Sequence, residues 1–185
     1  VYSIDGLFEI PHYGIEFSYQ MVNSNVNGTK GKGTSYELDY KLQPFKLQRF
    51  KTPIYIESWF KYDFYNRDFN IDNIGYLYRN NLKSSHIGIS LNIFEKSKKF
   101  LDLSFIIQYL KSENYSNIKL KDLISVDFNA QLLNFWFINA GISKSGISYI
   151  DRFYNEYFSL SIFTNSEKII KQPGEENYYI SFSTD

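Results

Sequence analysis

Residues 54–64 read Ile-Tyr-Ile-Glu-Ser-Trp-Phe-Lys-Tyr-Asp-Phe, and this segment decides the fold class. Its side chains alternate between a mostly apolar set and a set that carries the charges. The apolar set is Ile54, Ile56, Ser58, Phe60, Tyr62 and Phe64, and the other is Tyr55, Glu57, Trp59, Lys61 and Asp63. A repeat of two puts successive side chains on opposite sides of a β-strand, whereas a helix needs a repeat near 3.6. The segment therefore predicts a strand with one apolar and one polar side.

The same repeat recurs along the chain and predicts further strands. They cover residues 15–21, 36–42, 86–93, 101–109, 124–132, 133–143, 157–163 and 178–183. Residues rich in Gly, Asn, Ser and Lys separate them, so Asn23 to Gly33, Glu95 to Lys99 and Ser112 to Lys121 are predicted as loops. We expect roughly nine or ten antiparallel strands, mostly about eight to twelve residues long.

These strands are long for a globular sheet, where the average is about five or six residues. A tilted strand needs about 9 to 11 residues to cross a bilayer. The lengths favour an all-β fold, an antiparallel up-and-down transmembrane β-barrel or a large arc of one, with membrane lipid as its partner. The charged residues opposite the apolar side are then expected to face the lumen: Glu16, Glu37, Asp39, Lys41, Glu57, Lys61, Asp63, Asp102 and Asp127.

Composition narrows the function further. Seventeen Tyr, 17 Phe and 2 Trp favour strands over helices. Twenty basic and 20 acidic residues cancel, which argues against a nucleic-acid partner, because that would call for a clustered positive face. The sequence has no cysteine and two histidines, and we predict no cofactor. It contains no apolar run of about 18 residues and no leader at Val1, so we expect residues 1–185 to form one barrel domain cut from a longer chain.

The sequence contains only incomplete matches to motifs that bind metals or catalyse reactions. Asp68, Asn70 and Asp72 have the opening spacing of a calcium loop, but Asn73 replaces the tight-turn glycine and Arg79 the bidentate glutamate. Carboxylates six residues apart on one strand face, such as those of residues 57 and 63, are separated by about 20 Å, too far for a glycosidase pair. We predict no catalytic, cofactor-binding or metal-binding residue.

Three short motifs resemble those of a known family. Residues 68–81 (Asp-Phe-Asn-Ile-Asp-Asn-Ile-Gly-Tyr-Leu-Tyr-Arg-Asn-Asn), residues 134–141 (Asn-Phe-Trp-Phe-Ile-Asn-Ala-Gly) and Asp151-Arg152 occur in the family's order and spacing. The chain resembles, over residues 50–163, the C-terminal β-barrel domain (domain of unknown function 5916) of Bacteroidota envelope proteins that carry an N-terminal family-9-like carbohydrate-binding module. The residues that carry the resemblance are Asp72, Gly75, Arg79, Asn134, Trp136, Asp151 and Arg152. Residues 153–156 depart from the Gly-Gly-Pro run that usually follows in the family.

The resemblance implies a location in the outer membrane of a Gram-negative bacterium. It also implies a barrel that anchors a carbohydrate-binding module or passes small solutes, and it transfers no catalytic residue. The alternative is a soluble β-sandwich or open barrel that binds glycans through exposed aromatic rings. A hydrolase that acts through cross-strand carboxylates ranks last.

Overall fold

The computed structural model describes residues 1–45, 53–69, 80–94, 100–150 and 169–184. These residues form eleven strands and one 3-10 turn, η1 (Pro11–Tyr13), and they contain no α-helix. The strands are β1 (Tyr2–Ile10), β2 (Ile15–Val26), β3 (Thr29–Phe45), β4 (Ile54–Tyr65), β5 (Leu82–Phe94), β6 (Phe100–Glu113), β7 (Lys119–Leu132), β8 (Trp136–Ser145), β9 (Ser148–Ile150), β10 (Ile170–Gln172) and β11 (Glu176–Thr184).

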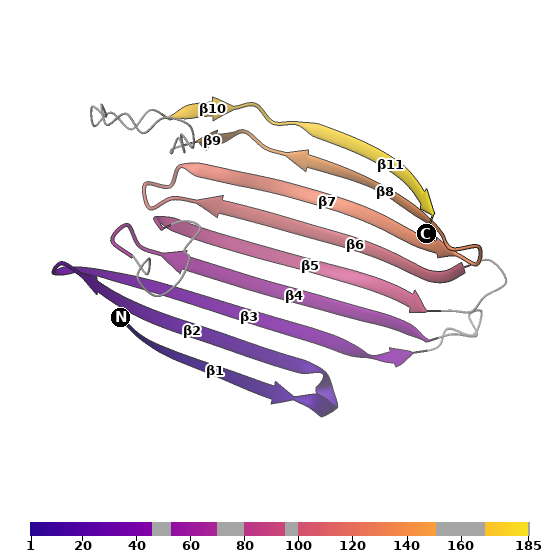
Figure 1. Ribbon diagram of the computed structural model, residues 1–185, viewed down its shortest axis with the longest axis horizontal. Coiled ribbons are helices and arrows are strands. Elements are labelled where there is room, and N and C mark those ends of the chain that lie inside the picture. The colour runs from indigo at the N-terminus through magenta and orange to yellow at the C-terminus, as the bar shows by residue number, and fades with distance from the viewer. Residues whose placement is uncertain (46–52, 70–79, 95–99, 151–168, 185) are drawn as a thin grey trace.

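Nine of these strands form one antiparallel sheet in the order β1-β2-β3-β4-β5-β6-β7-β8-β11 (Figure 1). The first eight lie next to their sequence neighbours, β11 pairs with β8, and β9 and β10 form a small separate ribbon. The predicted all-β antiparallel architecture is confirmed. The sheet is open, however, with β1 and β11 at its two edges instead of a closed ring.

The sheet has two distinct ends. The connections 11–14, 46–53, 95–99 and 133–135 join strands at one end, which we call the short-loop end. The connections 27–28, 66–81, 114–118 and 146–175 join strands at the other, which we call the long-loop end (Figure 1).

The register gives the sheet one apolar face. A single rank of facing residues crosses all nine strands and is apolar except at Ser58: Ile10, Ile15, Tyr40, Ser58, Ile89, Ile107, Val126, Ile142 and Tyr178. Side chains of directly paired residues lie on the same side of an antiparallel sheet. The alternation read in each strand therefore adds up to a continuous apolar surface, the apolar face.

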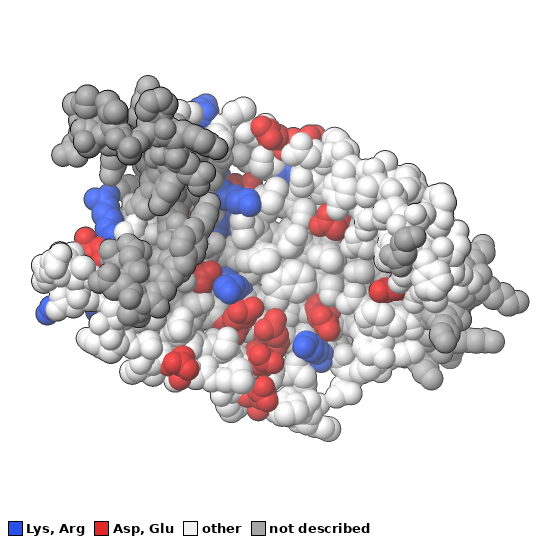
Figure 2. Space-filling model, viewed as in Figure 1, with Lys and Arg blue, Asp and Glu red and all other residues white. Residues whose placement is uncertain are grey.

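The opposite side is the polar face. Its adjacent rank runs through Glu9, Glu16, Asp39, Trp59, Gly88, Gln108, Ser125, Ser143 and Asn177. Figure 2 looks onto this face and shows acidic and basic side chains spread across the middle of the sheet.

The described residues supply no second layer of secondary structure against either face. The accessible surface is 13587 Å², whereas a compact protein of this length would expose roughly 9,300 Å². Among the described residues, the buried apolar side chains are Ile54, Phe69 and Ala130. The described residues therefore form a single layer without a conventional core.

The predicted loop from Asn23 to Gly33 is wrong in extent. Strands β2 and β3 continue to a two-residue turn in which Asn27 and Gly28 have φ values of 52° and 84°. Two successive positive φ values suit the right-handed twist of a tight hairpin, and Asn-Gly is the favoured pair for it. The neighbouring glycines are strand residues: a Cβ at Gly31 or Gly33 would collide with Phe69.

Other boundaries also differ. The predicted loop over residues 112–121 shrinks to 114–118, and the strand predicted from residue 133 begins at Trp136. Strand β1 was not predicted, although its pairing with β2 is regular. The predicted strand over 157–163 and the predicted turn over 95–99 lie outside the described residues.

Candidate functional site

The nine predicted lumen residues all fall on the polar face. They come from β2, β3, β4, β6 and β7, and the pairing register places each of them on the side opposite the apolar rank. Opposite charges face each other at two points, whereas Glu16 is paired directly with the carboxylates of Glu9 and Asp39. Lys61 Nζ lies 3.4 Å from Glu37 Oε2, and Lys41 is paired directly with Glu57. Since both partners of the first pair are about two-fifths exposed, it contributes little to stability.

Hydrogen bonds tie further members of this set to their neighbours. Ser35 donates to Asp63 at 2.7 Å. Asp127 accepts from Tyr179 at 2.7 Å and from Ser125 at 3.1 Å, which links β7 to the edge strand β11. These contacts fix polar side chains of the polar face in place.

Another set of polar contacts, made by Trp59, His86 and Gln108, lies at the centre of the polar face, on β4, β5 and β6. His86 Nε2 lies 2.9 Å from Gln108 Oε1 and 3.4 Å from Trp59 Nε1. One ring nitrogen cannot donate to the amide oxygen and also accept from the indole, and the shorter contact favours the tautomer that donates to Gln108. The Trp59 ring covers Gly88, where a Cβ would overlap the indole.

The polar face is the more enclosed of the two. The serines buried among the described residues, Ser24, Ser90, Ser112 and Ser125, all belong to it. On the apolar face, Ile87 is 52% and Ile89 46% exposed although both lie mid-strand in the centre of the sheet. Side chains converge on the inner side of a curved sheet and splay on its outer side. The polar face is therefore the inner one, and the apolar face points outward.

The apolar face has a shallow hollow over Ser58. Its walls come from β3 to β7, among them Tyr40, Phe60 and Ile107, and its volume is about 420 Å³. A small hydroxyl among large apolar residues creates the depression. Its lining is almost entirely apolar, so it suits a hydrocarbon chain and offers no set of polar groups for catalysis.

At the long-loop end, the segment after β4 folds onto the polar face. Phe69 is 1% exposed, and its ring stacks on Tyr65 with centroids 5.4 Å apart. Asn66 holds the segment down: its side chain accepts from the Lys32 N–H at 2.9 Å, and its own N–H donates to the Lys32 carbonyl at 3.0 Å. This inward wedge was not predicted. Glycines two residues apart inside an alternating strand were the available signal.

Two of the family-motif residues can be placed. Asn134 and Trp136 form the turn into β8, where the Trp136 N–H donates to Asn134 Oδ1 at 3.4 Å and Phe135 has a φ of 63°. The other motif residues, Asp72, Gly75, Arg79, Asp151 and Arg152, lie outside the described residues. The placed motif residues thus act as turn-formers.

The described part of the chain contains no group of three or more His, Cys, Asp or Glu side chains that could hold a metal ion. None of its helical segments has the length and apolar character needed to cross a membrane.

Comparison with known proteins identifies one family. Residues 12–185 match a family described as domain of unknown function (DUF5916). No curated protein and no solved structure matches the chain. The resemblance inferred from the motifs is confirmed for this domain.

Proposed function

We propose that this chain, which belongs to the family described as domain of unknown function (DUF5916), is a membrane-embedded arc of a β-barrel in the outer membrane of a Gram-negative bacterium. The observation that carries the proposal is the exposed apolar face, which crosses all nine strands and has no second layer against it among the described residues. Water is a poor environment for so large an apolar surface, and lipid is a good one.

The dimensions of the apolar face fit a bilayer. On β4 the apolar residues run from Ile54 to Phe64. Ten residue steps span about 33 Å along a strand, and a tilt of about 40° reduces this to about 25 Å across the membrane. The outward apolar band of membrane barrels has about that height.

The inner face suits a hydrated interior. Its charged side chains lie opposite one another in partly exposed pairs, as at Lys61 and Glu37, which is how charges persist beside water. In this arrangement the polar face lines a lumen, and the strand ladder satisfies the backbone groups of β2 to β8, whereas the outer edges of β1 and β11 need partner strands.

The role of such an arc is non-catalytic. From the family resemblance in the sequence, we propose that it anchors a carbohydrate-binding module to the membrane or lets small solutes pass along the polar face. Glu16 is paired directly with Glu9 and with Asp39 on the polar face, and no group of three or more His, Cys, Asp or Glu side chains that could hold a metal ion occurs among the described residues.

The two tryptophans provide a direct test, because they lie on opposite faces. Trp136 is on the apolar face and 46% exposed, and Trp59 is on the polar face. The variants Trp59→Phe and Trp136→Phe each leave one reporter. After reconstitution into phosphatidylcholine vesicles with brominated acyl chains, we expect strong quenching of Trp136 and little of Trp59. Equal quenching of the two, or protection of Trp136, would contradict the proposal.

The alternative, a soluble protein, requires a different structure. A β-sandwich that binds glycans would need a second layer to cover the Ile, Leu and Phe side chains of the apolar face. The described residues form one layer only. In the same experiment, a soluble protein would leave both tryptophans unquenched and would stay in the aqueous fraction.

A further inference from the structure

The apolar face ends differently at the two ends of the sheet. At the short-loop end it runs to the last residues of the strands, and its described members there, such as Ile10, Leu42 and Ile93, are uncharged. At the long-loop end it gives way to charge on several strands. We call these residues the charged rim: Lys30, Lys32, Lys83, Lys111, Glu113, Lys119, Asp122, Lys144 and Glu176.

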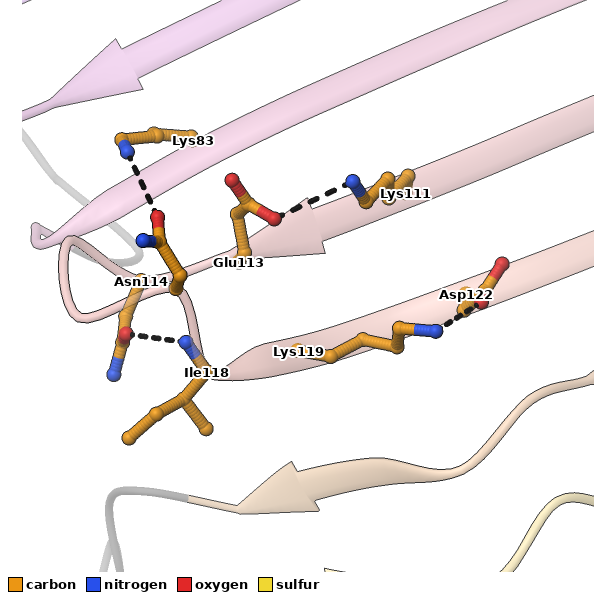
Figure 3. Close-up of polar contacts among 8 residues, drawn as sticks. Lys83, Lys111, Glu113, Asn114, Ile118, Lys119 and Asp122 are labelled. Atoms are coloured by element: carbon orange, nitrogen blue, oxygen red, sulfur yellow. Dashed lines mark hydrogen bonds and ion pairs between the residues drawn. The ribbon is translucent and has the colours of Figure 1, made fainter.

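The rim is ordered by local contacts (Figure 3). Lys111 Nζ lies 3.4 Å from Glu113 Oε2, and Lys119 Nζ lies 2.7 Å from Asp122 Oδ2. Lys144 pairs with Glu176 across β8 and β11. These pairs hold the ammonium groups at the level where the apolar surface stops.

Lys83 sits at the centre of the rim and is held by neutral groups. Its Nζ lies 3.4 Å from Asn117 Oδ1 and 5.2 Å from the centre of the Tyr115 ring. That ring also packs against Phe64, and its burial raises the pKa of the Tyr115 hydroxyl, so the phenol stays neutral beside the lysine. An ammonium over an aromatic face keeps its charge available to a ligand.

The rim carries a positive surplus. Its six lysines face three carboxylates, which leaves three positive charges on a band directly beside an apolar surface. The lysines in its three ion pairs are 40% to 66% exposed at their side chains. Exposed ion pairs contribute little to stability, so an incoming anion can share or displace the carboxylate.

We propose that the charged rim binds the phosphate groups of anionic lipid headgroups. This inference rests on the proposed membrane function. A bilayer places phosphates at the level where its hydrocarbon ends, and lysine side chains at the end of an apolar strand reach that level with their stems still in the apolar region.

The test compares lysines on the two faces. The rim variant is Lys83→Gln/Lys111→Gln/Lys144→Gln, and the matched control is Lys41→Gln/Lys61→Gln/Lys121→Gln, which removes the same charge from the polar face. Native mass spectrometry of the full chain in detergent, titrated with phosphatidylglycerol or phosphatidylcholine, measures the affinity for each lipid. We expect the unmodified protein and the control to prefer phosphatidylglycerol, and the rim variant to lose up to roughly fivefold of that preference per lysine.

Conservative replacement guards against a folding defect. The variant Lys83→Arg/Lys111→Arg/Lys144→Arg should keep the preference, which should also fall with added salt. The inference is overturned if the unmodified protein shows no preference, or if the rim variant and the control lose it equally. Quenching of Trp136 by brominated acyl chains, measured on the same variants, separates the two proposals. Quenching of Trp136 without a headgroup preference would contradict only the lipid-binding role of the charged rim. Loss of quenching would contradict the proposed membrane function itself.

Discussion

At the scale of single residues, aromatic rings laid across glycines recur in the sheet. Trp59 covers Gly88, Tyr179 covers Gly141, and in each pair the glycine lacks the Cβ that would hit the ring. Each pair joins adjacent strands, so the ring shields backbone that would otherwise be open to water. Such pairs help to fix register in a sheet without a core.

The variant Gly88→Ala tests this arrangement. Alanine in place of an open strand glycine usually stabilises by about 0.5–1 kcal/mol, because the unfolded chain loses freedom. At this position the Cβ would force the indole away from the sheet, and we expect a net loss of about 1–3 kcal/mol. Guanidinium unfolding in detergent, followed by Trp59 fluorescence in the Trp136→Phe background, measures it. Increased stability would show that the ring is not seated on Gly88.

At the scale of the strand, neighbouring residues on β6 offer a matched pair. Phe105 lies on the apolar face and is 41% exposed, and Ser104 lies on the polar face. Because a lysine near the bilayer midplane costs about 2–4 kcal/mol, Phe105→Lys should destabilise the protein by that amount, and Ser104→Lys by far less. Reversible denaturation from lipid vesicles gives both values. Similar values for the two variants would argue that the apolar face does not meet lipid.

The alternation within strands was predictable because it is local. The run from Ile54 to Phe64 contains both faces of β4, and the pairing register places all nine predicted polar residues on the same side of the sheet. The loop boundaries were not predictable in this way. Gly31 and Gly33 look like turn residues in the sequence. Glycine is needed at both positions because a Cβ there would collide with Phe69, which is distant in sequence. Signals of that kind depend on tertiary contact, which a local pattern does not contain.

At the scale of the whole molecule, the described sheet has no second layer, and in the proposed function lipid supplies the apolar contacts that an interior normally provides. The apolar face is exposed at the centre of the sheet, as at Ile87 and Ile89. We therefore expect the protein to require detergent for extraction, and to migrate differently on a denaturing gel before and after heating. Elution as a monomer from plain buffer, with no heat effect, would contradict membrane residence.

The sequence predicted the class of the molecule but not its closure. Eight of the predicted alternating segments correspond to strands of the described sheet, whereas its ninth strand, β1, was not predicted and the segment predicted over 157–163 lies outside the described residues. Whether the two edges of the sheet meet depends on the total curvature of all the strands. The alternation of apolar and polar residues within one strand does not determine that curvature.

The strand count has a consequence for how such a ring can be completed. In a sheet whose neighbours alternate in direction, the first and ninth members point the same way, so β1 and β11 are co-directional. Joining them to each other would create a parallel seam. A closed barrel built wholly from antiparallel pairs has an even number of strands. Any barrel that completes this sheet by that rule must therefore add an odd number of strands between β1 and β11.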